Sequence, residues 1–471
     1  MSVVSADGRA TTTLDQAALT ELARNFQGDL IPPDHPTYEE HRRVWNASID
    51  RHPALIARCT GVADVLAAVR FARETGILTA VRSGGHSFPG LSTCDDGLVI
   101  DLEQMKGIRV DPDKQTVRVQ AGVRLGELDH ETQAFGMAVS SGIVTHTGVA
   151  GLTLGGGIGW LMRKYGLTVD NLLAADVVTA SGELVHASAD QNAELFWGLR
   201  GGGGNFGIVT EFEFQMNPVS PVLLAGPIFW PMEDSPQVLR FYRDWITTVP
   251  DELTTIVIHR YAPALPIIPT ELQGKPVVAV GVCYAGSIED AERVVRPMRE
   301  FGKPVLDLCR PSRFVDHQAL FDASLPPGWW YYFRSCDVAE LSDGVIDTVA
   351  EHSLRMKSKV NTFPIFQLGG AVARVGDDET AYNGRQAGHT ININATTTTA
   401  EGFDAERAWS RGLWEALTPY HTGVYVNFLL DEGEERIRQA YGPAKYDRLK
   451  ALKRHYDPTN LFRLNQNISP D

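Results

Sequence analysis

Cysteine is scarce in this chain of 471 residues, and the few cysteines follow no pattern. They are Cys59, Cys94, Cys283, Cys309 and Cys336, an odd number without the spacing of a metal site or a disulfide framework. This scarcity excludes a small disulfide-stapled scaffold and a cysteine metal site, and we expect no bound metal. It favours free thiols in a reducing compartment.

Long apolar runs and clusters of positive charge are also missing. No stretch of ~18 apolar residues is available to span a bilayer, and the start MSVVSADGRATTTLDQ lacks the basic and apolar regions of a secretory signal. Lys and Arg number 43 against 58 Asp and Glu, a formal net charge of −15. Because such a surface repels phosphate polymers and anionic lipid, we expect neither nucleic acid nor a membrane as partner. The sequence indicates a cytoplasmic enzyme.

The pattern of expected strands and helices changes near residues 217–221. Before this point, short apolar strands at 54–59, 78–82, 97–102 and 115–122 alternate with a helix whose residues Val62, Val65, Leu66 and Val69 share one face. After it, residues 222–400 show longer strands, with helices expected at 235–248, 287–301 and 341–356. A helix, a strand over 424–430 and a helical stretch follow. This order predicts an α+β fold with helices on one face of a sheet.

Three glycine-rich segments carry the strongest chemical signal: residues 81–90, 145–160 and 195–214. The first of them does not have the GxGxxG spacing of a Rossmann nucleotide site and does not open a long helix. Backbone N–H groups without Cβ obstruction can surround a pyrophosphate or lie against a flat ligand. A tight turn with nothing bound is the alternative for each segment taken alone. His86 lies inside the first segment, and a neutral imidazole there can act as a nucleophile.

Six motifs in order along nearly the whole chain resemble one flavoprotein family. They are RSGGHS (82–87), TGVAGLTLGGGIG (147–159), YGLTVDN (165–171), LFWGLRGGGGNFGIV (195–209), VYVNF (424–428) and YDPTNLFRLNQNI (456–468). The family is the berberine-bridge-enzyme-like branch of the vanillyl-alcohol oxidase / p-cresol methylhydroxylase superfamily. The resemblance implies a two-part FAD-binding domain, with an N-terminal α/β part (1–215) and a C-terminal segment (405–471). It also implies a central substrate domain (216–404) with an antiparallel sheet covered by helices.

The resemblance implies FAD as the cofactor, bonded through its 8α carbon to His86. Many relatives add a cysteine bond four residues before the glycine that matches Gly148. Val144 stands there, and no cysteine lies between positions 94 and 283, so a monocovalent flavin is predicted. The family's cofactor contacts fall on Arg82, Ser83, Gly84, Gly85, His86, Ser87, Gly90, Thr147, Gly148, Gly151, Leu152, Gly155, Gly156, Gly159, Asn171, Gly207, Val209, Tyr425, Asn427, Asn465 and Asn467.

Tyr425, Asn392 and Thr147 are the predicted catalytic residues. Alternation in VYVN places Tyr425 and Asn427 on one face of a strand, toward the substrate. The Tyr425 phenol would serve as a proton acceptor if neighbouring donors lowered its pKa from ~10, and simple stacking beneath the flavin ring is the alternative. Asn392 and Asn394 align with a polar pair on the family's substrate strand, and the Thr147 hydroxyl is expected near flavin N5. The stretch 353–376 offers no carboxylate base.

These features favour an oxidase that takes a hydride from an alcohol-type or similar small molecule and passes electrons to O2, giving H2O2. The combination of THTG, Leu152 and NLFRLNQNI is similar to bacterial secondary-metabolism members of the branch, which raises an oxygenase of a polyketide-like substrate as the alternative. A dehydrogenase with another electron acceptor and a cofactor-loaded binding protein stay open. The sequence identifies no substrate and leaves a choice between monomer and homodimer.

Overall fold

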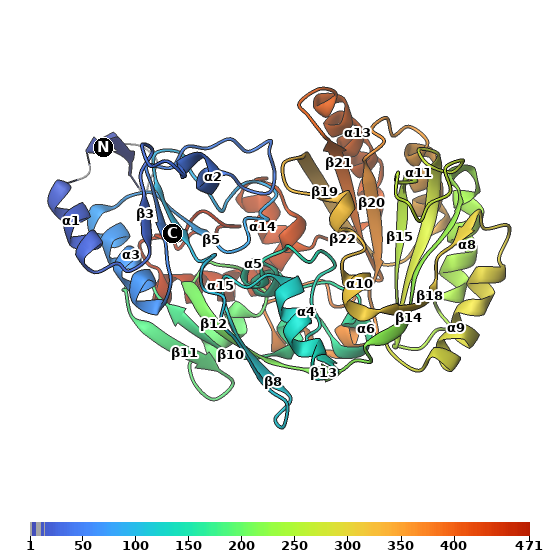
Figure 1. Ribbon diagram of the computed structural model, residues 1–471, viewed down its shortest axis with the longest axis horizontal. Helices are drawn as coiled ribbons and strands as arrows, with labels where there is room; N and C mark the ends of the chain where they lie inside the picture. The colour runs from blue at the N-terminus through green and yellow to red at the C-terminus, as the bar shows by residue number, and fades with distance from the viewer. Residues whose placement is uncertain (1, 6–10, 14) are drawn as a thin grey trace.

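The computed structural model describes residues 2–5, 11–13 and 15–471 and consists of two lobes. The first lobe, on the left of Figure 1, contains the N-terminal part of the chain and the C-terminal segment, so both marked ends lie there. The second lobe, on the right, is built on one large antiparallel sheet. The arrangement confirms the predicted fold class. Within the described residues, no helix has the length and apolar character needed to cross a membrane.

Two sheets in the first lobe share one hydrophobic core. Helix α3 (Val62–Thr75) packs against both of them, because Val65, Ala68 and Val69 on its apolar face are fully buried. The four-stranded sheet has the order β3 (Asp29–Ile31), β4 (Leu55–Arg58), β6 (Leu98–Asp101) and β5 (Thr79–Arg82), the last three parallel. The antiparallel five-stranded sheet has the order β11 (Leu184–Ser188), β10 (Leu172–Val178), β12 (Ile208–Gln215), β8 (Thr116–Gln120) and β7 (Ile108–Asp111).

Shorter elements complete this part of the chain, and they include the helices that border the glycine-rich loops. The helices are α1 (Gln16–Arg24), α2 (Tyr38–Arg42), α4 (Leu125–Gln133), α5 (Val149–Gly155), α6 (Met162–Tyr165), η1 (Thr168–Asn171) and α7 (Ala193–Leu199). Two small sheets pair β1 (Ser2–Val4) with β2 (Thr11–Thr13) and β9 (Met137–Ala138) with β13 (Asn217–Pro218). All five cysteines of the chain are buried free thiols, as predicted.

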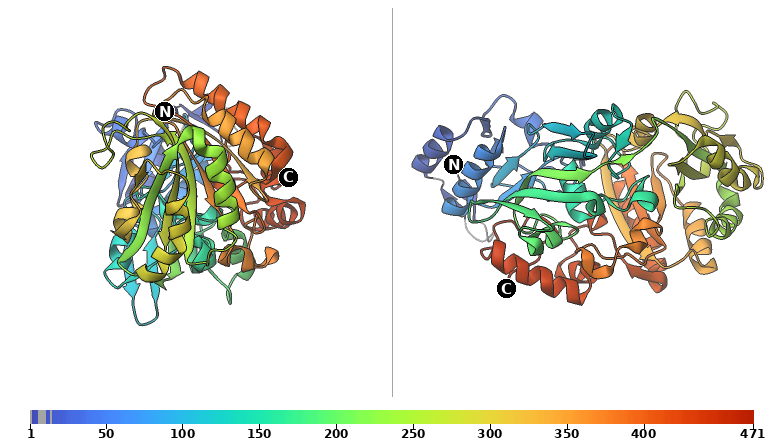
Figure 2. Two further views of the ribbon diagram at one scale, coloured as in Figure 1. Left: turned by 90° about the vertical axis from the view of Figure 1, so that its right-hand side faces the viewer. Right: turned by 90° about the horizontal axis from the view of Figure 1, so that it is seen from below.

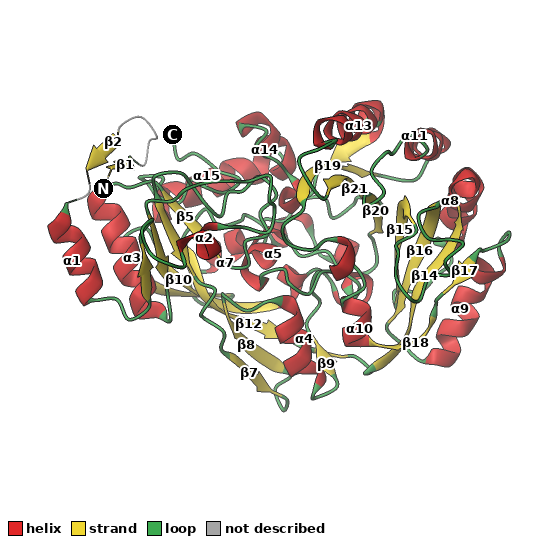
Figure 3. Ribbon diagram, turned by 45° about the horizontal axis from the view of Figure 1, so that its top comes forward, coloured by secondary structure: helices red, strands yellow, loops and turns green. Residues whose placement is uncertain are grey.

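The second lobe is a nine-stranded antiparallel sheet with two different faces. The outer face packs on four long helices, which line the outer side of the lobe in Figure 3. The inner face packs on the first lobe around Trp160 and Met162. The strand order is β17 (Leu306–Asp307), β14 (Val222–Pro231), β16 (Pro276–Tyr284), β15 (Leu253–Tyr261), β20 (Thr362–Gln367), β21 (His389–Thr397), β19 (Trp330–Val338) and β22 (His421–Gly423), with β18 (Arg310–Arg313) paired to β14.

The four outer helices are α8 (Ser235–Trp245), α9 (Ile288–Glu300), α11 (Asp343–Ser353) and α13 (Phe403–Ala416). The first three agree with the helices predicted within 222–400. Short helices at the lobe junction or in loops are α10 (Phe314–Gln318), α12 (Ala371–Arg374), η2 (Met232–Asp234), η3 (Asp322–Ser324), η4 (Asp377–Glu379) and η5 (Thr418–Tyr420).

After β22 the chain returns to the first lobe. It forms η6 (Val426–Phe428), α14 (Glu434–Tyr441) and α15 (Pro443–Tyr456), whose apolar side chains join the core of the first lobe. Figure 2 shows these C-terminal helices in red along that lobe. Helix α13, by contrast, packs on β19 and β21 of the second lobe. On this packing we propose that the C-terminal segment of the flavin domain begins near residue 424.

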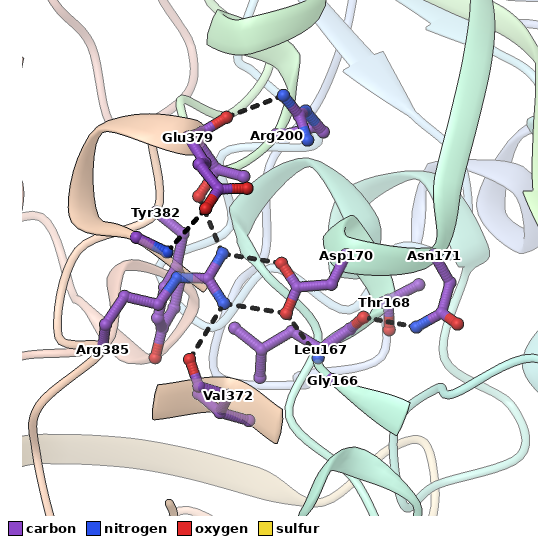
Figure 4. A network of polar contacts seen from close by, with 12 residues as sticks. Gly166, Leu167, Thr168, Asp170, Asn171, Arg200, Val372, Glu379, Tyr382 and Arg385 are labelled. Carbon is purple, nitrogen blue, oxygen red and sulfur yellow. Dashed lines mark hydrogen bonds and ion pairs between the residues drawn. The ribbon is translucent and has the colours of Figure 1, made fainter. Parts of the chain in front are cut away.

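A buried ion pair ties the two lobes together, as Figure 4 shows. Arg385 of the second lobe donates from Nη1 and Nη2 to the two carboxylate oxygens of Asp170 in η1, at 2.8 and 2.6 Å. The Arg385 side chain is fully buried, and Thr380 accepts a further hydrogen bond from it. Nearby, Arg200 donates to the Glu379 carbonyl oxygen at 2.7 Å. Paired, two-pronged contacts of this kind fix orientation as well as distance.

A second buried contact between the lobes depends on pH. Asp129 on α4 accepts a hydrogen bond from Gln318 on α10, at 2.9 Å, and burial raises its pKa to about 7 although the Gln318 amide lowers it. In the unfolded chain this carboxyl ionises near ~4, so above that pH the folded state binds the extra proton. The contribution of Asp129 to the free energy of unfolding is therefore greatest below pH ~4, and it is lost as the pH rises through about 7.

We expect Asp129→Asn to remove this pH dependence. The substituted amide needs no proton and can donate to Gln318 Oε1, which is buried without a partner in the wild type. The free energy of unfolding of the variant, relative to wild type, should rise by roughly 2–3 kcal/mol between pH 5 and pH 7, which urea titrations at the two pH values would measure. Asp34→Asn, at an exposed carboxyl, is the control and should show no such trend. An equal difference in the free energy of unfolding between Asp129→Asn and wild type at both pH values would contradict this role of Asp129.

Candidate active site

A cavity of about 340 Å³ lies between the two lobes. The first lobe contributes the loops around residues 83–92, 142–152 and 203–209, together with residues 425–429 and 464–466 of the C-terminal segment. The second lobe contributes side chains from β19, β20 and β21. The three glycine-rich segments, far apart in sequence, therefore meet around one space.

Most of the predicted site residues line this cavity. They are Ser83, Gly84, Gly85, His86, Ser87, Thr147, Gly148, Gly151, Leu152, Gly207, Val209, Asn392, Tyr425, Asn427 and Asn465. The structure thus brings together residues from both ends of the chain and from the central sheet. Which of them contact a cofactor stays a prediction.

The other predicted residues stand outside the cavity wall: Arg82, Gly90, Gly155, Gly156, Gly159, Asn171 and Asn467. Several of them have structural partners instead. Arg82 donates to the buried carboxylate of Asp101 at 2.7 Å. A Cβ on Gly159 would lie 1.6 Å from the Ser141 carbonyl oxygen, so this glycine permits a close backbone approach. Asn171 donates to nearby carbonyl groups and so closes a turn.

Gly84 and Gly148 bring two glycine-rich loops into backbone contact. A Cβ on Gly84 would lie 2.3 Å from the Gly148 nitrogen, and one on Gly148 would lie 2.4 Å from the Gly84 nitrogen. No other residue type fits at either position. The contact lets unobstructed backbone from both loops face the cavity, as binding of phosphate oxygens requires.

His86 faces the cavity beside a second histidine. Its Nε2 lies 2.6 Å from Nδ1 of His146, and its ring stacks on Trp45 with centroids 4.5 Å apart. Burial, with smaller contributions from His146 and Arg124, lowers the pKa of His86 well below its usual value. Burial also lowers the pKa of His146. Both imidazoles are therefore neutral at pH 7, and each keeps one unprotonated nitrogen.

Tyr425 and Asn427 lie together, although not on a strand as predicted. The chain leaves β22 at Gly423 and turns into the 3₁₀ helix η6, because Val424 and Val426 are buried in the core of the first lobe. The Tyr425 oxygen accepts hydrogen bonds from the Gly157 N–H and from Asn427 Nδ2, both at 2.8 Å. These donors lower the pKa of Tyr425, but burial outweighs them and raises it to about 12. The phenol therefore keeps its proton at pH 7.

The C-terminal tail is fastened to the third glycine-rich segment. Asn465 Nδ2 donates to the Gly204 carbonyl oxygen at 3.1 Å, and the Asn205 side chain bonds the backbone of Gln466 and Ile468. These contacts explain how residues more than 250 positions apart form one wall.

Comparison with known proteins decides the family. Residues 53–188 match the family described as FAD binding domain, and residues 424–469 match Berberine and berberine like. A FAD-linked oxidoreductase of Dictyostelium discoideum is 33% identical over 96% of this chain and 97% of its own length. This chain belongs to the berberine-bridge-enzyme-like FAD-linked oxidoreductases.

Solved structures agree with this assignment to the berberine-bridge-enzyme-like family. The 6-hydroxy-D-nicotine oxidase of Arthrobacter nicotinovorans superposes with a TM-score of 0.86 and 31% identity, covering 95% of this chain and 98% of that one. The glucooligosaccharide oxidase of Acremonium strictum, which is described with a 6-S-cysteinyl, 8α-N1-histidyl FAD, shares the fold at a TM-score of 0.85 and 24% identity, covering 97% and 100% of the two chains.

The cavity fits the FAD that berberine-bridge-enzyme-like proteins bind. Its volume is in the range of cofactor sites. A Cβ on Gly151 or Gly204 would meet no atom within 4 Å, so the backbone there borders open space. Asn465 Oδ1 is buried and has no partner among the described residues, and none of the lining residues is an Asp or Glu that would repel a diphosphate. The glycine-rich loops, Ser83, His86 and Asn465 would hold the cofactor.

The sequence did not identify which aromatic residues meet at the wall of the cavity. Trp45 stacks on Tyr331 of the second lobe at 3.8 Å, and Phe88 packs on Phe333 at 4.2 Å. The partners are about 245 to 285 positions apart, so no local pattern connects them. The aromatic run at 329–332 was a signal for such packing, but it does not say which residues it meets.

Proposed function

We propose that this enzyme is an oxidase whose FAD is bonded to His86 and that acts on an alcohol-type or similar small molecule. The observation that carries the proposal is a neutral imidazole facing a cavity bordered by three glycine-rich loops. FAD bound there supplies a hydride acceptor, whose electrons pass to O2 to give H2O2. The names of (R)-6-hydroxynicotine oxidase, from Paenarthrobacter nicotinovorans, and glucooligosaccharide oxidase support oxidase chemistry.

We propose that the contact with His146 favours one nitrogen of His86 for the covalent bond. At 2.6 Å, His86 Nε2 and His146 Nδ1 share a proton. When His86 holds this proton, its Nδ1 has a free lone pair and is the nucleophile. We therefore expect that Nδ1 would be the nitrogen that holds the flavin, while His146 keeps Nε2 in place. The N1-histidyl linkage of glucooligosaccharide oxidase is consistent with this assignment.

Tyr425 is suited to donate a hydrogen bond to the substrate oxygen. Both lone pairs of its oxygen are occupied by Gly157 and Asn427, and the high pKa keeps the phenolic proton in place at pH 7. This proton is then available to a group in the cavity, which Tyr425 lines. The role differs from that of a phenolate base, since burial outweighs the neighbouring donors. Asn392 and Thr147 line the same cavity and help to position the substrate.

We expect Tyr425→Phe to slow substrate oxidation by roughly 100-fold, the typical effect of removing one preorganised donor. The variant should keep its bound flavin, because the hydroxyl contacts only Gly157 and Asn427 among the described residues. The rate of flavin bleaching by substrate without oxygen, in a stopped-flow instrument, measures the effect. Tyr332→Phe, at a tyrosine outside the cavity wall, is the control. Reduction of Tyr425→Phe at the wild-type rate would contradict the donor role.

An anaerobic substrate screen tests the proposed function. Polyketide phenols, simple alcohols and oligosaccharides are mixed with the purified enzyme, and bleaching of flavin absorbance identifies a reductant. Admission of air should then give one H2O2 per product. Incorporation of ¹⁸O from O2 into the product would instead support the oxygenase alternative, and slow reoxidation in air would support a dehydrogenase. A flavin that no member of the screen bleaches would favour a binding protein.

A further inference from the structure

No lining residue of the cavity carries a formal charge. The described side chains that border it include no Asp, Glu, Lys or Arg. The one histidine of the wall, His86, is neutral at pH 7 because burial lowers its pKa well below its usual value. Beside β19, β20 and β21 a charged group would lose its hydration without gaining a counter-ion, which is strongly unfavourable, whereas the glycine-rich loops of the first lobe offer backbone N–H groups to the FAD diphosphate. The part of the cavity that borders the second lobe therefore selects against ionic substrates.

Three neutral polar side chains face the cavity from the second lobe. Thr362, Asn392 and Asn394 are 1%, 4% and 1% exposed, so each is nearly excluded from bulk solvent. Their oxygens, Thr362 Oγ1 and the Oδ1 atoms of Asn392 and Asn394, have no hydrogen-bond partner among the described residues. Buried polar groups are normally paired, because an unpaired group loses its hydration without gaining a hydrogen bond in return. The cluster is thus available to a ligand.

Strand pairing places these three side chains together. Asn392 and Asn394 are alternate residues of β21, so they project from one face about 7 Å apart. Thr362 is on the neighbouring strand β20, which pairs antiparallel with β21 through Ile365 opposite Ile391, and its side chain borders the same cavity. The cluster forms a short row of hydrogen-bonding groups with fixed spacing.

Aromatic rings border this row. Phe333 is the direct cross-strand partner of Asn394 and packs on Phe88 with centroids 4.2 Å apart. The ring centroid of Phe428 lies 5.9 Å from that of Phe88 and 5.9 Å from that of Phe366. These contacts extend the aromatic surface around the cavity. Such surfaces favour flat ring systems, which they contact through faces and edges.

We propose that the substrate is an uncharged molecule with a flat ring system and two hydroxyl groups about 7 Å apart, which donate hydrogen bonds to the Oδ1 atoms of Asn392 and Asn394. The inference rests on the proposed function, because it names the substrate class of that cavity. An oligosaccharide would place most of its hydroxyl groups against rings that cannot pair them. A carboxylate or ammonium compound would bring an unpaired charge. The cavity chemistry disfavours both classes.

Binding of four compounds to the FAD-loaded protein, measured by isothermal titration calorimetry, tests the proposal. The first is 2,7-dihydroxynaphthalene, whose hydroxyl oxygens have the spacing of alternate strand residues, about 7 Å. The others are 2-naphthol with one hydroxyl, naphthalene-2,7-disulfonate with two charges, and xylobiose. We expect the diol to bind, 2-naphthol to bind roughly tenfold more weakly, and the other two to show no binding.

Two variants assign the contacts. Asn392→Leu and Asn394→Leu should each weaken diol binding roughly tenfold, while one of the two leaves 2-naphthol binding unchanged, because a single hydroxyl reaches one amide. Thr396→Val, on the same face of β21 but outside the cavity wall, should bind the diol like wild type. Flavin absorbance and the melting temperature check that the variants are folded. The order of the binding affinities of the four compounds for the wild-type protein tests the proposal even if a variant fails to fold.

Three results would overturn the proposal: tighter binding of the disulfonate or xylobiose than of the diol, wild-type diol binding by both leucine variants, or no binding of the diol. Calorimetry requires no turnover, so the proposed function is judged separately. A protein that binds the diol as expected but whose flavin no compound reduces would contradict the oxidase and leave the binding inference standing. An active oxidase that binds xylobiose more tightly than the diol would support the proposed function and contradict the binding inference.

Discussion

His86→Ala is expected to release its flavin when the protein is precipitated with trichloroacetic acid, whereas the wild-type pellet stays yellow. The imidazole is the only nucleophilic nitrogen that lines the cavity in the described part of the chain, and Val144 stands where a second, cysteine bond would form. Without the bond, the cofactor is held by hydrogen bonds alone and leaves when the fold is lost. Absorbance of pellet and supernatant, with the mass of the tryptic peptide that contains residue 86, measures the outcome.

The exposed histidine His52 provides a matched control for this experiment. His52→Ala makes the same chemical change at the surface and should keep a yellow pellet. A coloured pellet from His86→Ala would place the bond elsewhere. Wild-type protein made with ample riboflavin but colourless, with no added dinucleotide mass on its peptides, would remove the basis of the proposed function.

Lys453→Met is expected to lower the free energy of unfolding by about 3–5 kcal/mol, the cost of leaving one partner of a buried ion pair alone. Lys453 and Asp457 on and after α15 are fully buried, with Nζ 2.7 Å from the carboxylate. The same Nζ donates to the carbonyl oxygens of Asn205 and Phe462, each at 2.9 Å. The substitution therefore also loosens the tail from the third glycine-rich segment. Urea unfolding followed by tryptophan fluorescence would measure the loss.

A surface pair supplies the comparison for Lys453→Met. Arg293 and Asp290 on α9 form an i,i+3 pair with side chains 71% and 51% exposed, so Arg293→Met should cost less than about 1 kcal/mol. A double variant, Lys453→Met with Asp457→Leu, removes both charges and should recover part of the loss. Equal effects of Lys453→Met and Arg293→Met would show that burial adds nothing to this pair.

The local elements and the cofactor loops could be predicted from the sequence. The helical spacing of Val62, Val65 and Val69 predicted α3, and that helix packs against two sheets with Val65 and Val69 fully buried and Val62 partly buried. Glycines at 84 and 148 predicted a backbone surface, and their mutual contact leaves no room for a side chain. The helical spacing and the glycine positions both depend on the local residue types alone. They can therefore be recognised without knowledge of the rest of the fold.

Long-range packing explains what the sequence could not predict. The segment at 424–428 alternates like a strand, but burial of its valines in the first lobe turns it into η6. The phenol of Tyr425 seemed suited to a base, yet its pKa depends on a burial that only the folded chain creates. The contact of His86 with His146, 60 residues away, was equally invisible, because two histidines signal nothing about each other until their loops meet.

The closing of one cavity by both ends of the chain sets an order of events during biosynthesis. His86 leaves the ribosome long before Asn465 and Gln466, which follow it by about 380 positions. The nascent polypeptide therefore has the histidine that we propose to bind the flavin long before it has a complete pocket. On the proposed function, retained yellow colour would then mark chains that extend as far as Gln466, and chains terminated before that point would be recognisable by its absence.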